Sequence, residues 1–200
     1  EIIINNSYDN GHISFVGNSD ALAARPNANV IGYMEKENVG IVILAAEREA
    51  SDAKGGIFGL FKNRLTLGEI AQFEAVGQED IFEDVGLVEG DDAQAFNTNS
   101  IYTNDKLLKG LYAKLKEIGL TDDDIDQMMQ PDLIVNGKEK EGIGKYDQLE
   151  GALGASVLNF NLNLEKLRKE NAELNKWMND NLGENQPLVQ VVQASTSFST

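Results

Sequence analysis

Apolar runs and helical spacing alternate along the first quarter of the chain and predict an α/β fold. A short apolar run over residues 14–16 ends at Gly17, as a strand that stops abruptly does. Residues 29–38 carry apolar positions at helical spacing, with Asn29 as the candidate N-cap. Residues 41–46 are continuously apolar, which is typical of a strand covered on both faces. The order strand, helix, strand predicts a right-handed βαβ unit.

The rest of the chain continues this alternation within 200 residues, a length that suits one domain with a real core. The predicted strands cover residues 57–61, 65–72, 95–102, 131–135 and 188–192, with a hairpin turn at 62–63. The predicted helices cover residues 104–118, a short stretch capped by Thr121, residues 146–160 and residues 162–182. Small residues on one flank of 146–160 indicate that another element packs closely there; they are Gly151, Ala152, Gly154 and Ala155.

Residues 162–182 form the most helical stretch and allow two interpretations. Leucines and a methionine recur at a three-four spacing with Asn171 between them. This pattern is typical of a short coiled coil, through which the chain would form a homo-oligomer with Asn171 fixing the register. It is equally the pattern of an amphipathic helix lying on its own domain. Two heptads are too few to hold a dimer by themselves, which favours the second interpretation.

Composition and charge exclude several classes of partner. The net charge is −16 and the pI is near 4.4, so neither nucleic acid nor an anionic membrane is an expected partner. No apolar run reaches the length of a membrane span, and no signal peptide is visible. The chain has no cysteine, which excludes disulfides and suits the cytoplasm, and its single histidine, His12, excludes a His-rich metal site. An anionic nucleotide would need a divalent cation or nearby lysines to offset the field of this chain.

Asn18 and Asp20 directly follow the first strand, at the carboxyl end where open α/β sheets bind ligands. Two residues apart, they lie on the same side of an extended chain. An amide binds a sugar hydroxyl, and a carboxylate binds a divalent cation. The alternative is an Asx turn, which needs only local hydrogen bonds.

Asn97 and Asn99 stand inside an otherwise apolar strand. A buried amide without partners costs about 1–3 kcal/mol for each unsatisfied group, and a sugar would supply such partners.

Two further motifs could bind a ligand or a metal ion, but each also has a purely structural explanation. The adjacent glycines Gly55 and Gly56 allow a close approach of backbone to a ligand, but they also make turns. The acidic run 122–124 with Asp126 resembles a metal cluster but lacks the glycine and the terminal glutamate of an EF-hand. It fits better as a helix N-terminus that uses the helix dipole.

Six segments resemble, in the same order, motifs of the eukaryotic-type UDP-glucose pyrophosphorylases. They are residues 15–24 (FVGNSDALAA), 52–56 (DAKGG), 69–72 (EIAQ), 96–101 (FNTNSI), 133–138 (LIVNGK) and 148–155 (QLEGALGA). The resemblance implies a GT-A-like, Rossmann-like nucleotidyltransferase domain with a mixed central sheet. Such an enzyme forms UDP-glucose and pyrophosphate from UTP and glucose 1-phosphate with Mg²⁺.

The resemblance also implies roles for individual residues. The Asn and Asp of the family fall on Asn18 and Asp20, near the sugar–phosphate junction, with Asp20 as the magnesium ligand. Its loop glycine falls on Gly56, and its contacts to sugar hydroxyls fall on Glu69 and Asn97. Catalysis in this family is positioning and charge neutralisation, so no residue of this chain is expected to act as an acid or base.

The sequence also departs from the family pattern. Ala21, Ala23 and Ser100 replace an Asn, a Gly and an Asn. The family's G-G-x-G-T loop for the UTP phosphates and its lysines are absent from the 200 residues. We therefore expect residues 1–200 to be part of one catalytic domain, its sugar-binding portion, with 162–182 as a charged helical insertion. The isolated chain is then expected to be inactive.

Two alternatives to this function remain at the level of sequence. One is a pyrophosphorylase for UDP-N-acetylhexosamine or another UDP sugar. Glu69 and Asn97 favour an unmodified hexose, because an acetamido group needs an apolar slot. The other is a non-catalytic interaction module of the same fold that uses residues 162–182 to bind a partner.

Overall fold

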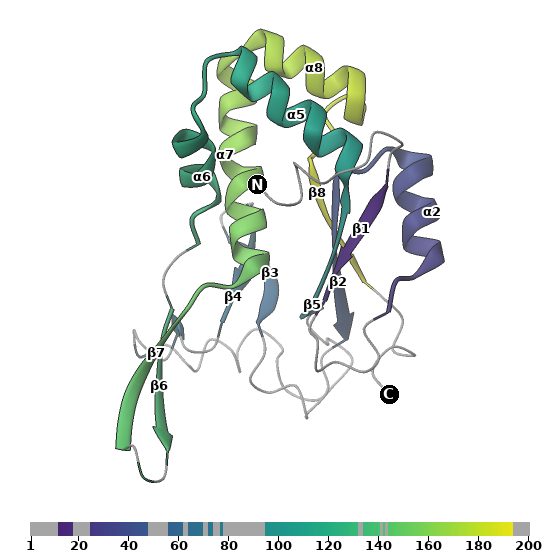
Figure 1. The fold of residues 1–200 in the computed structure, drawn as a ribbon. Helices are drawn as coiled ribbons and strands as arrows, with labels where there is room; N and C mark the ends of the chain where they lie inside the picture. Colours follow the sequence, from purple (N-terminus) through teal and green to yellow (C-terminus); the bar gives the residue numbers. More distant parts are fainter. Residues whose placement is uncertain are drawn as a thin grey trace.

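A mixed sheet forms the centre of the fold, with helices on both of its faces (Figure 1). The computed structural model describes residues 12–17, 25–47, 56–61, 64–69, 72–73, 77, 95–131, 134–140, 142 and 144–193. The six strands of this sheet are β1 (Ile13–Val16), β2 (Ile41–Glu47), β3 (Ile57–Phe61), β4 (Arg64–Gly68), β5 (Ala95–Asn104) and β8 (Val189–Gln193). The helices are α2 (Ala28–Glu37), α5 (Asp105–Glu117), α6 (Asp122–Met129), α7 (Leu153–Glu170) and α8 (Ala172–Leu182). The predicted α/β fold class with a mixed sheet is confirmed.

The sheet is organised around β5, in the order β4-β3-β5-β2-β8. β2 pairs with β5 along one edge, whereas β1 and β3 pair with the two ends of its other edge, all antiparallel. β8 pairs with β2 in parallel. β1 and β2 therefore run in the same direction with β5 between them, and α2 connects them. The predicted order of strand, helix and strand is confirmed.

β2 is covered on both faces, as its continuous apolar sequence predicts. Residues 41–46 are all buried. Ile41, Ile43 and Ala45 belong to the core beneath α5, α7 and α8. Val42 and Leu44 belong to the core on the other face, beneath α2. The two cores explain why alternation is absent from this strand.

The N-cap of α2 is Asn27, and the prediction of Asn29 was wrong. The side-chain oxygen of Asn27 accepts a hydrogen bond from the backbone N–H of Asn29 at 2.8 Å. Asn27 has the extended backbone of a cap, so the helix starts at Ala28.

The predicted helix over residues 146–160 was wrong in its first part. Residues 146–150 belong to strand β7 (Gly144–Glu150), which pairs antiparallel with β6 (Ile134–Lys140). The two strands form a hairpin that projects from the body (Figure 1). Gly142 and Gly144 have φ of 82° and 87° at its turn, a backbone region that glycine adopts without strain. The helical spacing in this part of the sequence begins only at Leu153.

Residues 162–182 form two helices, α7 and α8, so the prediction of a single helix over this segment was wrong. The chain breaks between α7 and α8 at Asn171, whose side chain caps α8 by accepting from the Leu174 N–H at 2.9 Å. Leu164, Leu174 and Met178 are fully buried in the core of this chain. The coiled-coil interpretation of these residues was wrong, and the amphipathic interpretation is confirmed.

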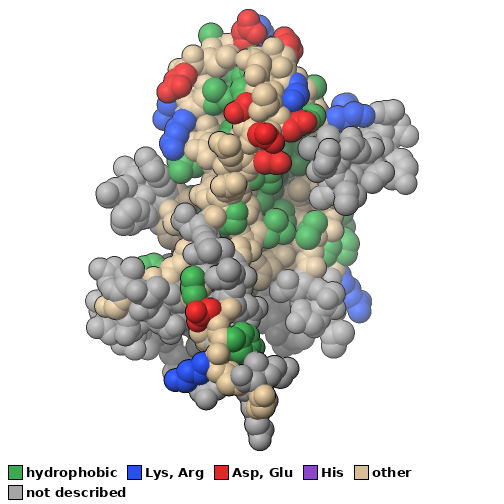
Figure 2. Space-filling model, turned by 60° about the vertical axis from the view of Figure 1, so that its left-hand side comes forward, with side chains coloured by type: hydrophobic (Ala, Val, Ile, Leu, Met, Phe, Trp, Pro, Cys, Tyr) green, Lys and Arg blue, Asp and Glu red, His purple; other side chains and the backbone are tan. Residues whose placement is uncertain are grey.

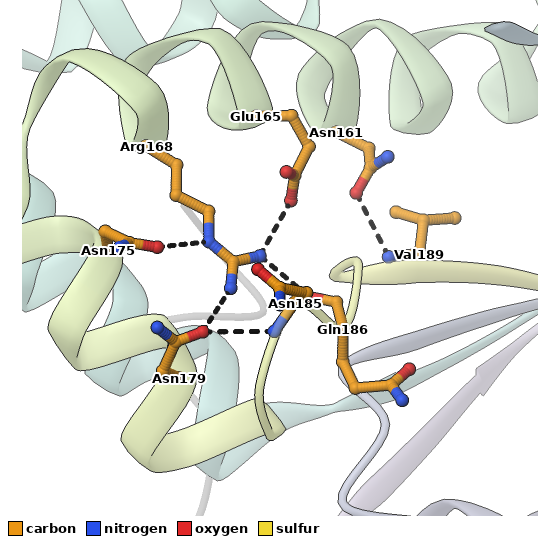
Figure 3. Close-up of polar contacts among 8 residues, drawn as sticks. All are labelled: Asn161, Glu165, Arg168, Asn175, Asn179, Asn185, Gln186 and Val189. Carbon is orange, nitrogen blue, oxygen red and sulfur yellow. Dashed lines mark hydrogen bonds and ion pairs between the residues drawn. The ribbon is translucent and has the colours of Figure 1, made fainter. Parts of the chain in front are cut away.

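Arg168 of α7 forms hydrogen bonds to α8 across the turn between the two helices (Figure 3). Its residue is 5% exposed. The guanidinium donates to the side-chain oxygens of Asn175 at 2.9 Å and Asn179 at 2.5 Å, and to the Gln186 carbonyl at 2.9 Å. Glu165 pairs with it at 3.2 Å. One side chain thus joins α7, α8 and the segment that leads into β8.

The acidic run at residues 122–124 forms a helix N-terminus, as predicted. Thr121 and Asp124 form a capping box at the start of α6. Hydrogen bonds from the Thr121 hydroxyl and backbone N–H lower the pKa of Asp124 below its ordinary value. Among the described residues, no group of three or more His, Asp or Glu side chains could hold a metal ion.

Charged side chains of both signs are interspersed over the helical end of the molecule (Figure 2). Lys114 on α5 pairs with Glu117 at 2.9 Å and with Glu173 of α8 at 3.2 Å. Lys116 pairs with Asp122 at 3.0 Å. Lysines at this end therefore lie beside carboxylates. None of the described helices is both long and apolar enough to span a membrane.

Candidate functional site

Three of the five predicted site residues lie together at one edge of the sheet. Gly56 directly precedes β3, Glu69 directly follows β4, and Asn97 lies near the start of β5. The β3–β4 hairpin pairs Ile57 with Gly68, which brings Gly56 and Glu69 side by side. The Asn97 N–H donates to the Gly56 carbonyl at 2.8 Å. We call Gly56, Glu69 and Asn97 the edge cluster.

Glu69 packs directly on the backbone of Gly56. A Cβ at Gly56 would lie 2.4 Å from the Glu69 Oε1, a distance that real Cβ atoms essentially never show. The backbone of Glu69 is fixed by Gln72, whose Oε1 accepts from the Glu69 N–H and whose own N–H donates to the Glu69 carbonyl, both at 2.9 Å. Gln72 thus fixes the backbone of the residue that follows β4. The Glu and the Gln of the EIAQ motif are therefore joined by two hydrogen bonds, through which the Gln positions the Glu.

A bulge in β5 shapes the surroundings of Asn97. Leu44 of β2 pairs with Ser100, but the next residue, Ala45, pairs with Asn97. Residues 98 and 99 are therefore extra on β5, and the Thr98 hydroxyl donates to the Leu44 carbonyl at 2.8 Å. Bulges redirect side chains and are common beside functional sites.

The amide of Asn97 finds its first partners within the bulge. Its Nδ2 donates to the Asn99 Oδ1 at 2.9 Å, and its Oδ1 accepts from the Asn99 N–H at 3.1 Å. Asn97 is only 3% exposed. Asn99 therefore already supplies partners to this buried amide without a sugar. One N–H and one lone pair of the amide remain for other contacts.

Gly154, predicted only as one of four small residues at a close packing contact, lies beside Asn97 of the edge cluster. It lies in the first turn of α7, where a Cβ would be 3.0 Å from the Leu67 Cδ2 and 3.3 Å from the Asn97 Nδ2. The predicted close packing of the small residues in this region is confirmed here. Glycine is unfavourable within a helix, so a glycine at this predicted helical position indicates that another element packs closely against it.

Asn18 and Asp20, together with most of the DAKGG loop, lie outside the described residues. The strand that leads to them is described and half-buried. β1 runs antiparallel to β5 and ends with Val16 opposite Ile101, so its carboxyl end is directed toward the bulge. β2 ends at the same edge, with Glu47 opposite Ala95. The edge cluster therefore lies where the carboxyl ends of two parallel strands meet, which is the usual ligand position in open α/β sheets.

The fold is therefore an α/β domain with a mixed sheet, and one edge of that sheet holds a carboxylate, an amide and a close glycine contact. The family model described as UTP–glucose-1-phosphate uridylyltransferase matches residues 5–172. This match covers most of the chain, and the chain belongs to that family. The predicted resemblance is confirmed.

Individual relatives agree with this assignment. The chain is 31% identical over 147 residues to UTP–glucose-1-phosphate uridylyltransferase 2 of Dictyostelium discoideum, covering 74% of this chain and 26% of that protein. It is 28% identical over 148 residues to the UTP–glucose-1-phosphate uridylyltransferase of Encephalitozoon cuniculi, covering 73% and 26%. The chain thus spans about a quarter of the length of these curated relatives.

Solved structures of similar proteins include the UDP-glucose pyrophosphorylase of Leishmania major. That structure matches with 27% identity and a TM-score of 0.49, over 73% of this chain and 31% of the other. The UDP-glucose phosphorylase of Trypanosoma brucei matches with 24% identity and a TM-score of 0.49, over 74% and 30%.

Proposed function

We propose that this chain carries the sugar-binding part of a UTP–glucose-1-phosphate uridylyltransferase, which forms UDP-glucose and pyrophosphate from UTP and glucose 1-phosphate. Membership of the family supports the reaction. The observation that carries the sugar-binding role is the edge cluster, in which three separate motifs of the sequence meet at one edge of the sheet. We place the protein in the cytoplasm, which suits a chain without cysteine.

The chemistry of the edge cluster suits a neutral polyol better than a phosphate. The Glu69 carboxylate only accepts hydrogen bonds, and hydroxyl groups are donors that match it. The Asn97 amide keeps one donor and one acceptor, and hydroxyl groups of a sugar can accept from the first and donate to the second. A carboxylate would repel a phosphate, so we orient the hexose toward Glu69 and the phosphates away from it. In a chain with a net charge of −16, this arrangement limits repulsion of the nucleotide.

We further propose that Asn18 and Asp20 lie at the sugar–phosphate junction and that Asp20 is a ligand of Mg²⁺. The donor chemistry fits, because Mg²⁺ in such sites takes one or two carboxylates together with substrate phosphates. When bound, the cation neutralises charge on the phosphates. Within the described residues, the direction of β1 supports this proposal, because the carboxyl end of β1 faces the bulge beside Asn97.

Replacing Gly56 with alanine is expected to weaken binding of UDP-glucose at least about tenfold, which corresponds to about 1.4 kcal/mol. The new Cβ would lie 2.4 Å from the Glu69 Oε1 and would therefore displace the carboxylate. The displaced atom is the end of a flexible side chain, so the free energy of unfolding should change by less than about 1 kcal/mol. Calorimetric titration with UDP-glucose and Mg²⁺, together with urea unfolding, measures both effects.

Gly59→Ala is the matched control for this experiment. Gly59 lies on β3, three residues further along, and a Cβ there meets nothing within 4 Å. We expect this variant to bind UDP-glucose like the unmodified chain. Equal affinities of the two variants would contradict the sugar-binding role of Glu69.

A further inference from the structure

We propose that Asn99 is a positioning residue that fixes the orientation of the Asn97 amide toward the sugar. This inference rests on the proposed function, because it assigns Asn99 a role through the predicted sugar contact of Asn97. Asn99 itself is exposed, whereas Asn97 is 3% exposed. An exposed residue, Asn99, therefore orients the buried amide of Asn97.

The two hydrogen bonds between these residues define the orientation of the amide. The backbone N–H of Asn99 can only donate, so the Asn97 atom 3.1 Å from it must be the oxygen. The Asn97 nitrogen then faces the Asn99 Oδ1 at 2.9 Å, and the Asn99 oxygen accepts from it. A flipped amide would set two donors against each other and two acceptors against each other. The flip is therefore strongly disfavoured, and the free N–H and lone pair of Asn97 keep fixed directions.

The backbone at position 99 explains why asparagine fits here. Asn99 has φ of 54°, in the left-handed region that only glycine adopts freely and that asparagine and aspartate tolerate better than other residues. This conformation accompanies the two-residue bulge, in which residues 98 and 99 are not paired in the register of β2 and β5. Asparagine thus meets two requirements, the left-handed backbone and an acceptor for the Asn97 Nδ2. Glycine meets only the first, and aspartate meets both.

The difference between glycine and aspartate provides the test. In Asn99→Gly, the bulge and the N–H contact remain, but the Asn97 nitrogen loses its acceptor. We expect the affinity for UDP-glucose with Mg²⁺ to fall about fivefold, the size of one neutral hydrogen bond, and the affinity for UDP to stay within about twofold. In Asn99→Asp, measured at about 0.5 M salt to screen the added charge, we expect recovery to within about twofold. The Nδ2 protons of Asn97, followed by NMR, should exchange faster with water in Asn99→Gly than in Asn99→Asp.

The outcomes separate this inference from the proposed function. If the unmodified chain binds UDP-glucose no better than UDP, the proposed sugar site and this inference both fail. If the unmodified chain prefers UDP-glucose and Asn99→Gly keeps that preference, only the positioning role is overturned. A loss of affinity in Asn99→Gly that is equal for UDP and UDP-glucose also overturns it, because amide orientation should affect the sugar alone. Urea unfolding of both variants shows whether the fold is retained.

Discussion

Replacing Arg168 with methionine is expected to lower the free energy of unfolding by about 3 kcal/mol or more. The guanidinium is buried and joins α7, α8 and the segment before β8 through Asn175, Asn179 and the Gln186 carbonyl (Figure 3). Its removal leaves the Asn175 oxygen, the Gln186 carbonyl and the Glu165 carboxylate without the guanidinium donor, whereas the Asn179 oxygen keeps the Asn185 N–H at 3.1 Å. Methionine keeps much of the apolar stem, so the loss reports mainly on the polar network.

Urea unfolding measures this effect, and the single tryptophan of the chain, Trp177 on α8, is a local reporter. Lys169→Met is the matched control, because it removes the same charge from the next residue of α7, which is exposed. We expect the control to change the free energy of unfolding by less than about 0.5 kcal/mol. Similar values for the two variants would mean that the Arg168 network does not stabilise the turn.

Replacing Leu174 with glutamate is expected to lower the free energy of unfolding by more than about 4 kcal/mol, a large part of the stability of an ordinary domain. Leu174 is fully buried in the core together with Leu164 and Met178. A carboxylate there would be desolvated without a partner. The same substitution would leave a well-folded chain if Leu174 belonged to an exposed seam for self-association.

Ala172→Glu is the control for this prediction. It adds the same charge two residues earlier, at an exposed position in the first turn of α8, where a carboxylate is favourable. Circular dichroism during urea unfolding reports stability, and light scattering after gel filtration reports mass. A Leu174→Glu chain that unfolds like the control but has lost self-association would contradict the buried position of Leu174.

Local sequence patterns predicted much of the fold because the decisive interactions are local. The continuous apolar run at 41–46 became the strand covered on both faces, and residues 104–118 became α5, capped by Asn104. Thr121 and Asp124 formed a capping box within one turn. In each case the residues that determine the structure lie within a few positions of one another.

The errors arose where one residue type serves two structures. Asparagine occurs both at polar positions of a coiled-coil seam and at helix N-caps. Asn171 is the N-cap of α8, and the leucines on either side of it are buried in one core. Residues 146–150 carry no strong strand pattern, and their conformation comes from pairing with β6. Spacing alone reveals neither the pairing nor the core.

The sequence motifs named the residues of the candidate site, but they did not predict how these residues lie relative to one another. The motifs named Gly56, Glu69 and Asn97, and the register of β3, β4 and β5 brings them together. The two-residue bulge and the left-handed backbone of Asn99 supply the partners of the Asn97 amide. The approach of Gly154 depends on how α7 packs on the sheet. These features follow from tertiary contacts, which no local pattern encodes.

The most direct test of the sugar-binding role is an NMR titration of this chain with UDP-glucose and Mg²⁺, compared with UDP and Mg²⁺. We predict that UDP-glucose shifts the amide resonances of Gly56, Glu69 and Asn97, together with the side-chain amide of Asn97, and that UDP shifts them much less. Identical shifts with the two ligands, or shifts confined to residues away from the edge cluster, would contradict the assignment of the sugar site.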